Sequence, residues 1–99
     1  MVTIQQTDDF RDWLHGLKDG LTRARLVARL RKVANGNFGD HKSVGDGVFE
    51  LRETFGPGWR MYYLQRGETI VVMLGGGDKS TQSKDIAHAK KLAQQVGEL

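Results

Sequence analysis

Three cationic side chains, Arg52, Arg60 and Lys79, have a spacing that predicts a shared site. Arg52 and Arg60 lie in two alternating apolar and polar segments joined by the short turn 56–58. A hairpin of these segments sets the two arginines opposite each other, where like charges repel unless an anion joins them. Lys79 follows the apolar segment that suits the next strand. The pattern indicates a site for an anionic ligand such as phosphate.

Two further side chains are expected near these cations. By strand alternation, Glu50 shares a face with Arg52, and Tyr62 shares a face with Arg60. Glu50 and Tyr62 are therefore candidates for proton transfer, and the Tyr62 ring is also a candidate for stacking on a nucleic acid base. The alternative is that the two arginines lie on the surface and pair with local acids such as Glu50 and Glu53.

The glycine run 75–77, followed by Asp78 and Lys79, suggests a phosphate-binding turn between a strand and a helix. A nucleotide-binding P-loop is excluded, because its second glycine is required where Asp78 stands, and because the chain is too short for such a domain. We therefore expect a tight turn that positions Lys79, with Ser80 or Thr81 as the helix cap.

Basic residues are concentrated in one helical segment. They are Arg23, Arg25, Arg29, Arg31 and Lys32, with no acidic residue between Asp19 and Asp40. Such a block attracts a polyanion or an acidic protein, and it is equally consistent with a solvated helix face. The candidate nucleic-acid-binding residues are Arg25, Arg29, Lys32 and, in the following loop, Lys42.

Other kinds of site find no support in the sequence. His15, His41 and His88 match no metal-ligand spacing, so we predict neither a metal nor another cofactor. No serine is paired with a histidine in a recognisable order, which argues against a hydrolase triad.

The composition indicates one small domain spanning residues 1–99. Hydrophobic residues make up 38% of the chain and the formal net charge is +3. Cysteine is absent, which excludes disulfides, and the apolar runs are too short to cross a membrane. The first residues lack the basic start and apolar stretch of a secretory signal, so we expect a cytoplasmic protein.

The elements that must position the cations follow from hydrophobic periodicity and turn residues. Thr7 or Asp8 is expected to cap the first helix and Gly20 to end it. The full expected order is a short strand at 2–4, a helix hairpin over 7–20 and 22–36, a loop at 37–47, strands at 48–55, 59–65 and 69–74, and a helix over 81–97.

Several motifs in this order resemble a known family. They are the Arg-rich helix ending in 35–40, the Lys42 loop, Gly-Val-Phe-Glu-Leu-Arg at 47–52, Gly-Pro-Gly-Trp-Arg-Met-Tyr-Tyr at 56–63, and Gly-Gly-Gly-Asp-Lys-Ser-Thr-Gln at 75–82. Together they resemble the addiction module killer protein branch of the RelE/ParE toxin superfamily, close to the HigB-type toxins. The resemblance covers nearly the whole chain.

The resemblance implies an α+β fold of the RelE type. In this fold an N-terminal helical hairpin packs on a small, mainly antiparallel four-stranded sheet, and a C-terminal helix lies near the active face. It also implies the toxin of a type II toxin–antitoxin system, an endoribonuclease (mRNA interferase) that acts on mRNA, commonly on the ribosome. The implied partner is a cognate antitoxin, often a small helix-turn-helix protein, bound in a hetero-oligomer.

The resemblance also suggests roles for individual residues. Arg52 and Arg60 are expected to contact the phosphate and the transition state, and Lys79 to act as a third cation or an acid. The chemistry implied is metal-free attack of the RNA 2′-hydroxyl on the adjacent phosphate. Where relatives carry a Tyr or His acid or base near the C-terminus, this chain has only Gln82 and His88, outside a matching motif. The alternative is a ParE-like, non-enzymatic toxin directed at DNA gyrase.

Overall fold

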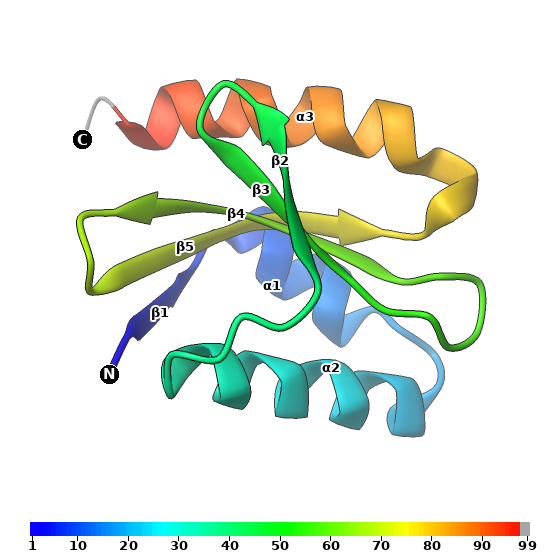
Figure 1. Ribbon diagram of the computed structural model, residues 1–99. Helices are drawn as coiled ribbons and strands as arrows, with labels where there is room; N and C mark the ends of the chain where they lie inside the picture. The colour runs from blue at the N-terminus through cyan, green and yellow to red at the C-terminus, as the bar shows by residue number, and fades with distance from the viewer. Residues whose placement is uncertain (98–99) are drawn as a thin grey trace.

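The computed structural model describes residues 1–97 (Figure 1). Its elements are β1 (Thr3–Gln6), α1 (Asp8–His15), α2 (Gly20–Ala34), β2 (His41–Gly45), β3 (Val48–Arg52), β4 (Arg60–Arg66), β5 (Ile70–Gly77), the 3₁₀ turn η1 (Lys79–Thr81) and α3 (Gln82–Gly97). Within residues 1–97, no helix has both the length and the apolar character needed to cross a membrane.

The strands form one mixed sheet in the order β1-β5-β4-β3-β2. β1 runs parallel to β5, and the other three pairs are antiparallel. The hairpin of α1 and α2 covers one face, and α3 covers the other (Figure 1). The predicted α+β class is confirmed, but the sheet has five strands rather than four, and the helices are placed differently from the prediction.

The additional strand, β2, lies in the segment expected to be a loop. Its residues pair with β3, with His41 opposite Leu51 and Lys42 opposite Glu50. Most of its side chains are exposed, so no apolar alternation marks it in the sequence. β2 is held by backbone hydrogen bonds at the sheet edge, and the left-handed Asp46 (φ 56°) makes the turn into β3.

The predicted boundary between the first two helices is wrong. α1 ends at His15 with Gly16 as its cap, and Gly20 begins α2 rather than ending α1. Asp19 caps α2, because its carboxylate accepts a hydrogen bond from the backbone N–H of Leu21 (3.1 Å). The predicted Thr7 cap of α1 is confirmed, since its hydroxyl oxygen accepts from the N–H of Phe10 (3.1 Å).

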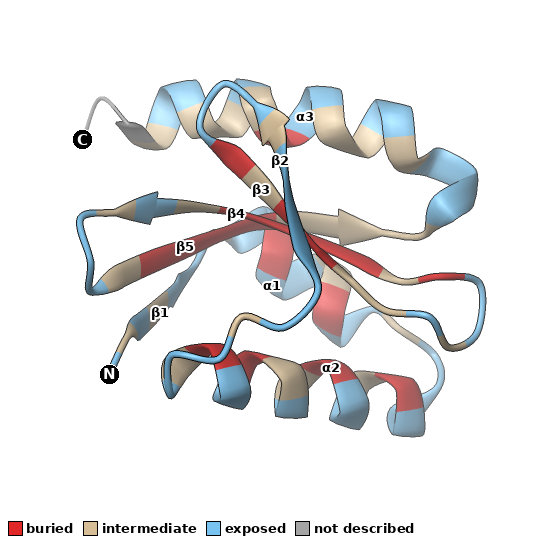
Figure 2. Ribbon diagram, in the orientation of Figure 1, coloured by how far each residue is buried: buried red, intermediate tan, exposed pale blue. Residues whose placement is uncertain are grey.

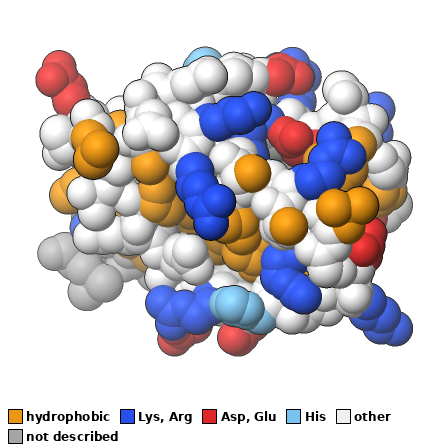
Figure 3. Space-filling model, turned by 90° about the horizontal axis from the view of Figure 1, so that it is seen from below, with side chains coloured by type: hydrophobic (Ala, Val, Ile, Leu, Met, Phe, Trp, Pro, Cys, Tyr) orange, Lys and Arg blue, Asp and Glu red, His pale blue; other side chains and the backbone are white. Residues whose placement is uncertain are grey.

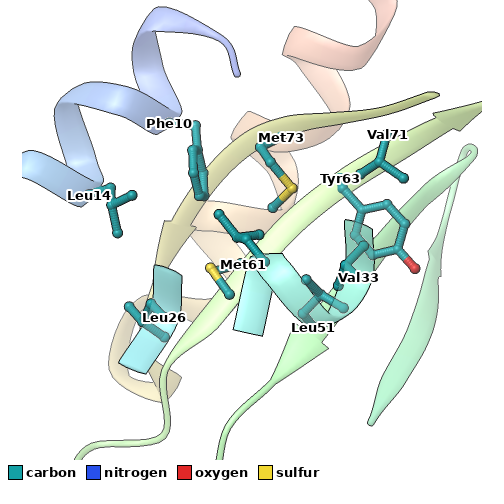
Figure 4. Close-up of a cluster of buried hydrophobic side chains, with 10 residues drawn as sticks. Phe10, Leu14, Leu26, Val33, Leu51, Met61, Tyr63, Val71 and Met73 are labelled. Atoms are coloured by element: carbon teal, nitrogen blue, oxygen red, sulfur yellow. The ribbon is translucent and has the colours of Figure 1, made fainter. Parts of the chain in front are cut away.

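The core under α1 and α2 is apolar (Figure 4). Helix side chains such as Phe10, Leu14 and Leu26 pack against strand side chains such as Leu51 and Met61. Helical spacing places the first set on one stripe, and strand alternation places the second set on one sheet face. This layer fixes the helices on the sheet.

The core under α3 is smaller and includes Tyr62. This side chain is fully buried with Val72, Leu74 and Ala89. Residues 60–63 of β4 are all buried (Figure 2), so the side chains at the centre of this strand are covered from both sides of the sheet. The expectation of an exposed Tyr62 is therefore wrong: α3 covers the face that the sequence pattern alone left open.

The glycine run also differs from expectation, because β5 continues through Gly77 instead of turning at Gly75. A Cβ on Gly76 would overlap the ring of Trp13, and a Cβ on Gly77 would overlap the carboxylate of Asp85. The glycines thus allow α1 and α3 to approach opposite faces of the same strand end. Close packing, rather than a phosphate cradle, explains this run.

Candidate anion-binding cleft

The strand register brings the three predicted cations to one end of the sheet. Arg52 of β3 lies opposite Arg60 of β4, which in turn lies opposite Gly77 of β5. Lys79 follows two residues later, in the turn that leads to α3. The predicted hairpin geometry for Arg52 and Arg60 is confirmed.

A cleft of about 390 Å³ opens where these residues meet. Arg52, Arg60 and Lys79 line it together with Asp40 and with residues 53, 54 and 56–58 of the following turn. Three cations within one concave surface attract an anion more strongly than the same charges spread over a flat surface, because the cleft focuses their field. The cleft is the candidate functional site.

Lys79 reaches the cleft by passing over the turn between β3 and β4. Gly58 has a φ of +81°, and a Cβ there would lie 3.0 Å from Cγ of Lys79. The backbone on both sides of Lys79 is fixed by Asp78, whose carboxylate accepts a hydrogen bond from the N–H of Ser80 (2.8 Å). This bonding lowers the pKa of Asp78. Asp78, two residues before Ser80, is thus the cap of the 3₁₀ turn η1, and the cap of the last helix at Ser80 or Thr81 stays a prediction.

Arg52 is held by Asp40. Its Nη2 and Nε both donate to Oδ1 of Asp40, at 2.8 and 3.2 Å. The side chains remain 36% and 51% exposed, respectively. The hydrogen bond from Arg52 lowers the pKa of the Asp40 carboxyl, so this group is ionised at neutral pH.

Arg60 is largely buried, and its guanidinium is held by protein groups on the side away from the cleft. Its Nη1 donates to the carbonyl oxygens of Glu53 and Trp59, both at 3.0 Å. Its Nε lies 3.8 Å from Oε1 of Glu50, a buried carboxylate that accepts a hydrogen bond from Gln82 of α3 (2.8 Å). The alternative of pairing with local acids therefore holds for Arg60 and Glu50, while Arg52 pairs with Asp40 instead.

Glu50 and Tyr62 lie behind the cleft rather than in it. Both are buried, and neither is among the residues that line the cleft. The Tyr62 hydroxyl forms no hydrogen bond of normal geometry among residues 1–97, and burial, followed by the charge of the neighbouring Glu50 carboxylate, raises the pKa of its phenol. A buried, un-ionised phenol cannot stack on a base or readily accept a proton, which corrects the stacking role expected for Tyr62.

Arg29, predicted to bind RNA, is engaged within the protein. Its guanidinium forms an ion pair with Glu53 and donates to the carbonyl oxygens of Phe38, Asp40 and Arg52. These bonds tie α2 to the loop before β2 and to the end of β3. They favour a structural role over a nucleic-acid contact.

The other basic residues lie outside the cleft. Arg25 stacks over Phe55, with its guanidinium carbon 3.8 Å from the ring centre. Lys32 is exposed on α2, and Lys42 is exposed on the edge strand β2. Seen from the α2 side, Lys and Arg side chains are separated by neutral and hydrophobic groups (Figure 3). RNA binding by these three residues stays a prediction.

Sequence reasoning missed Asp40 as a member of the cleft and named Glu53 only as an acid that could pair with the arginines. Asp40 precedes β2, and its place opposite the end of β3 became visible only with the fifth strand. Glu53 follows Arg52 directly, one residue beyond the end of the strand, and this position could have indicated that it lies beside the cleft. Among residues 1–97, no three His, Asp or Glu side chains are grouped so that they could hold a metal ion.

Comparison with known proteins places the chain in a family. Residues 12–96 match the family model described as phage derived protein Gp49-like (DUF891). The chain belongs to this Gp49-like family. A curated relative from Haemophilus influenzae, an uncharacterized protein, is 48% identical over 96 residues, covering 97% of each chain.

Two solved structures share the fold of this Gp49-like chain. One is the RelBE2 toxin–antitoxin complex from Mycobacterium tuberculosis, with 26% identity and a TM-score of 0.51 over 79% of this chain and 98% of that chain. The other is the conserved hypothetical protein HP0894 from Helicobacter pylori, with 21% identity and a TM-score of 0.54 over 81% and 97%. These likenesses support the RelE-like fold implied by the sequence resemblance.

Proposed function

We propose that this Gp49-like chain is the toxin of a toxin–antitoxin pair and that it cleaves mRNA in the cleft of Arg52, Arg60 and Lys79. The observation that carries the proposal is the convergence of three cations from separate segments on one cleft. The likeness to a toxin–antitoxin complex supports the toxin role and a cognate antitoxin as partner. The HigB-like branch and a cytoplasmic location are part of the same proposal.

The cleft suits cleavage in which the RNA supplies its own nucleophile. The 2′-oxygen attacks the adjacent phosphorus, the bond from phosphorus to the 5′-oxygen breaks, and the products are a 2′,3′-cyclic phosphate and a 5′-hydroxyl. Arg52 and Arg60 stabilise the additional negative charge on the phosphate oxygens. Lys79 provides the third cation and donates a proton to the leaving 5′-oxygen.

The proton released by the 2′-hydroxyl needs an acceptor. The two carboxylates that line the cleft are already engaged, Asp40 with Arg52 and Glu53 with Arg29. Glu50 and Tyr62 are buried behind Arg60. We therefore propose that the ribosome completes the site by positioning the mRNA and providing the acceptor, which makes cleavage ribosome-dependent.

Within residues 1–97, both carboxylates that line the cleft are engaged in ion pairs, which also favours a second candidate. A ParE-like toxin that inhibits DNA gyrase requires no chemistry from its own side chains. This function predicts DNA damage with intact mRNA.

Inducing the chain alone in cells, followed by mapping of new RNA ends, separates the two candidates. The ribonuclease proposal predicts new ends within coding regions, which disappear in the Arg52→Ala and Arg60→Ala variants. Arg11→Ala is the matched control, because Arg11 makes only an exposed ion pair with Asp8. Unchanged mRNA together with arrested replication and loss of gyrase supercoiling would replace the ribonuclease by the gyrase toxin.

A further inference from the structure

We propose that Asp40 is a built-in anionic occupant of the cleft, which an RNA phosphate must displace from Arg52 in order to bind. The inference rests on the proposed function and adds a residue that sets the affinity of the site. Asp40 takes the position on the guanidinium that a phosphate oxygen would otherwise take.

The geometry of the pair supports this role. Nε and Nη2 of Arg52 form the guanidinium edge that binds a carboxylate or a phosphate with two hydrogen bonds. Both nitrogens donate to the same oxygen of Asp40, at 3.2 and 2.8 Å. The preferred edge of Arg52 is therefore occupied before any ligand arrives.

The backbone of Asp40 is fixed in this position. Its carbonyl oxygen accepts from the N–H of Arg52 (3.0 Å) and from Nη2 of Arg29 (2.8 Å). Arg29 approaches this loop closely at Gly39, where φ is +62° and a Cβ would lie 3.1 Å from Nη2. The loop therefore presents the carboxylate to Arg52 as part of the fold, and side-chain rotation alone is enough to release it.

The pair is also accessible to displacement. Asp40 and Arg52 are each more than a third exposed, and exposed ion pairs are held weakly. A phosphate that reaches Arg52 gains Arg60 and Lys79 as well, which Asp40 does not contact. Asp40 thus competes with the ligand in two ways: its negative charge repels a phosphate, and its hydrogen bonds occupy one edge of the Arg52 guanidinium.

The test measures binding without cleavage. A short fluorescent RNA with 2′-O-methyl groups throughout lacks the nucleophile, so its anisotropy reports affinity for the full chain. Asp40→Asn is expected to bind this RNA about 5- to 10-fold more tightly than the unsubstituted chain at low salt, because one negative charge leaves the cleft. The gain should shrink as salt is raised.

Asp46→Asn is the matched control. It removes the same charge and an ion pair with Lys90, but at the turn end of the β2–β3 hairpin, opposite the end that carries Asp40. Its affinity should equal that of the unsubstituted chain. Equal gains in both variants would reduce the effect to net charge and overturn the inference.

The remaining outcomes distinguish the inference from the proposed function. Equal or weaker binding by Asp40→Asn, with RNA bound by the unsubstituted chain, overturns the role of Asp40 alone. Tighter binding without any mRNA cleavage in cells supports Asp40 and overturns the ribonuclease. No binding by any of the three proteins, with the RNA either free or held on ribosomes, overturns both.

Discussion

The two faces of the sheet are built differently. The face under α1 and α2 packs apolar side chains throughout, from Phe10 to Met61. The face under α3 is apolar at one end, around Leu74, but at the other it buries Glu50 behind the cleft and Arg60 in the cleft wall. The difference indicates that the two faces have different roles. The face under α1 and α2 stabilises the fold, whereas the face under α3 also positions the charged side chains of the cleft.

Burying an unpaired charge costs several kcal/mol of folding free energy, about the size of the desolvation penalty, so a buried charged side chain points to a specific role. Arg60 is the one cleft cation with a buried side chain; Arg52 and Lys79 are more accessible. Its guanidinium bonds two carbonyl oxygens and lies beside Glu50. This arrangement fixes the direction of Arg60 before a ligand binds, whereas the Arg52 side chain has to exchange partners.

The largest expected effect is on the apolar face. Phe10→Ala should lower the free energy of unfolding by about 3–5 kcal/mol, because it removes a fully buried ring and leaves a cavity. Leu21→Ala is the control, since Leu21 is 71% exposed and should change stability by less than about 0.5 kcal/mol. Urea unfolding measures both. Similar losses in the two variants would refute the assigned core.

The cleft arginines should separate activity from stability. Arg52→Ala is expected to reduce mRNA cleavage by about 100-fold or more, with little change in the urea midpoint, because the side chain is 36% exposed. Arg60→Ala should reduce both cleavage and stability, since it leaves Glu50 buried without its cation. Cleavage rates beside urea midpoints provide the comparison. A stability loss in Arg52→Ala as large as in Arg60→Ala would contradict the contrast.

The glycine run tests how closely both faces are packed. Gly76→Ala should destabilise the protein by about 1–3 kcal/mol, because its Cβ overlaps the Trp13 ring. Gly75→Ala is the matched control, because a Cβ there meets no atom within 4 Å among the described residues other than its chain neighbours. Thermal unfolding compares the pair. Equal melting temperatures would show that α1 does not pack on β5 as described.

Removing the buried hydroxyl of Tyr62 should change the free energy of unfolding less, and the sign of this change tests whether the hydroxyl has a hydrogen-bond partner. Tyr62→Phe should leave the free energy of unfolding unchanged within about 1 kcal/mol or raise it, because the hydroxyl it removes has no partner among residues 1–97. Urea unfolding of the single variant is sufficient. A loss well above 1 kcal/mol would mean that the hydroxyl is hydrogen-bonded in solution, and that this face is more polar than the structure indicates.

The smallest effect concerns the carboxylate beside Lys79. The pKa of Asp78 is lowered by its bonds to Ser80, so the unfolded chain takes up the proton first as the pH falls. The stability from Asp78 is therefore full above about pH 4 and is lost on further acidification. Asp78→Asn should show a smaller drop in urea midpoint between pH 7 and pH 3. An unchanged drop would contradict this.

Much of this architecture follows from sequence pattern. Turn residues and alternation predicted β3, β4 and the opposition of Arg52 and Arg60, because hairpin register is a local property. β2 was not predictable in this way: it is an exposed edge strand that depends on backbone pairing with β3. Because β2 was not predicted, the contact between Asp40 and Arg52, which are 12 residues apart in sequence, was not predicted either.

The burial of Tyr62 shows a second limit. Alternation correctly separates Tyr62 from Tyr63 onto opposite faces, but it does not reveal whether both faces are covered. That depends on where α3 packs, which is a long-range property. Proton-transfer candidates chosen from alternation alone were therefore placed on a face that proved to be closed.

The most direct test of the central claim is the chemistry of cleavage on translating ribosomes. The purified chain is incubated with a defined mRNA, with and without ribosomes, and the new ends are characterised. The account predicts ribosome-dependent cuts that carry a 2′,3′-cyclic phosphate and a 5′-hydroxyl, and that are lost in Arg52→Ala. Intact mRNA under both conditions, or cuts that leave a 5′-phosphate, would contradict it.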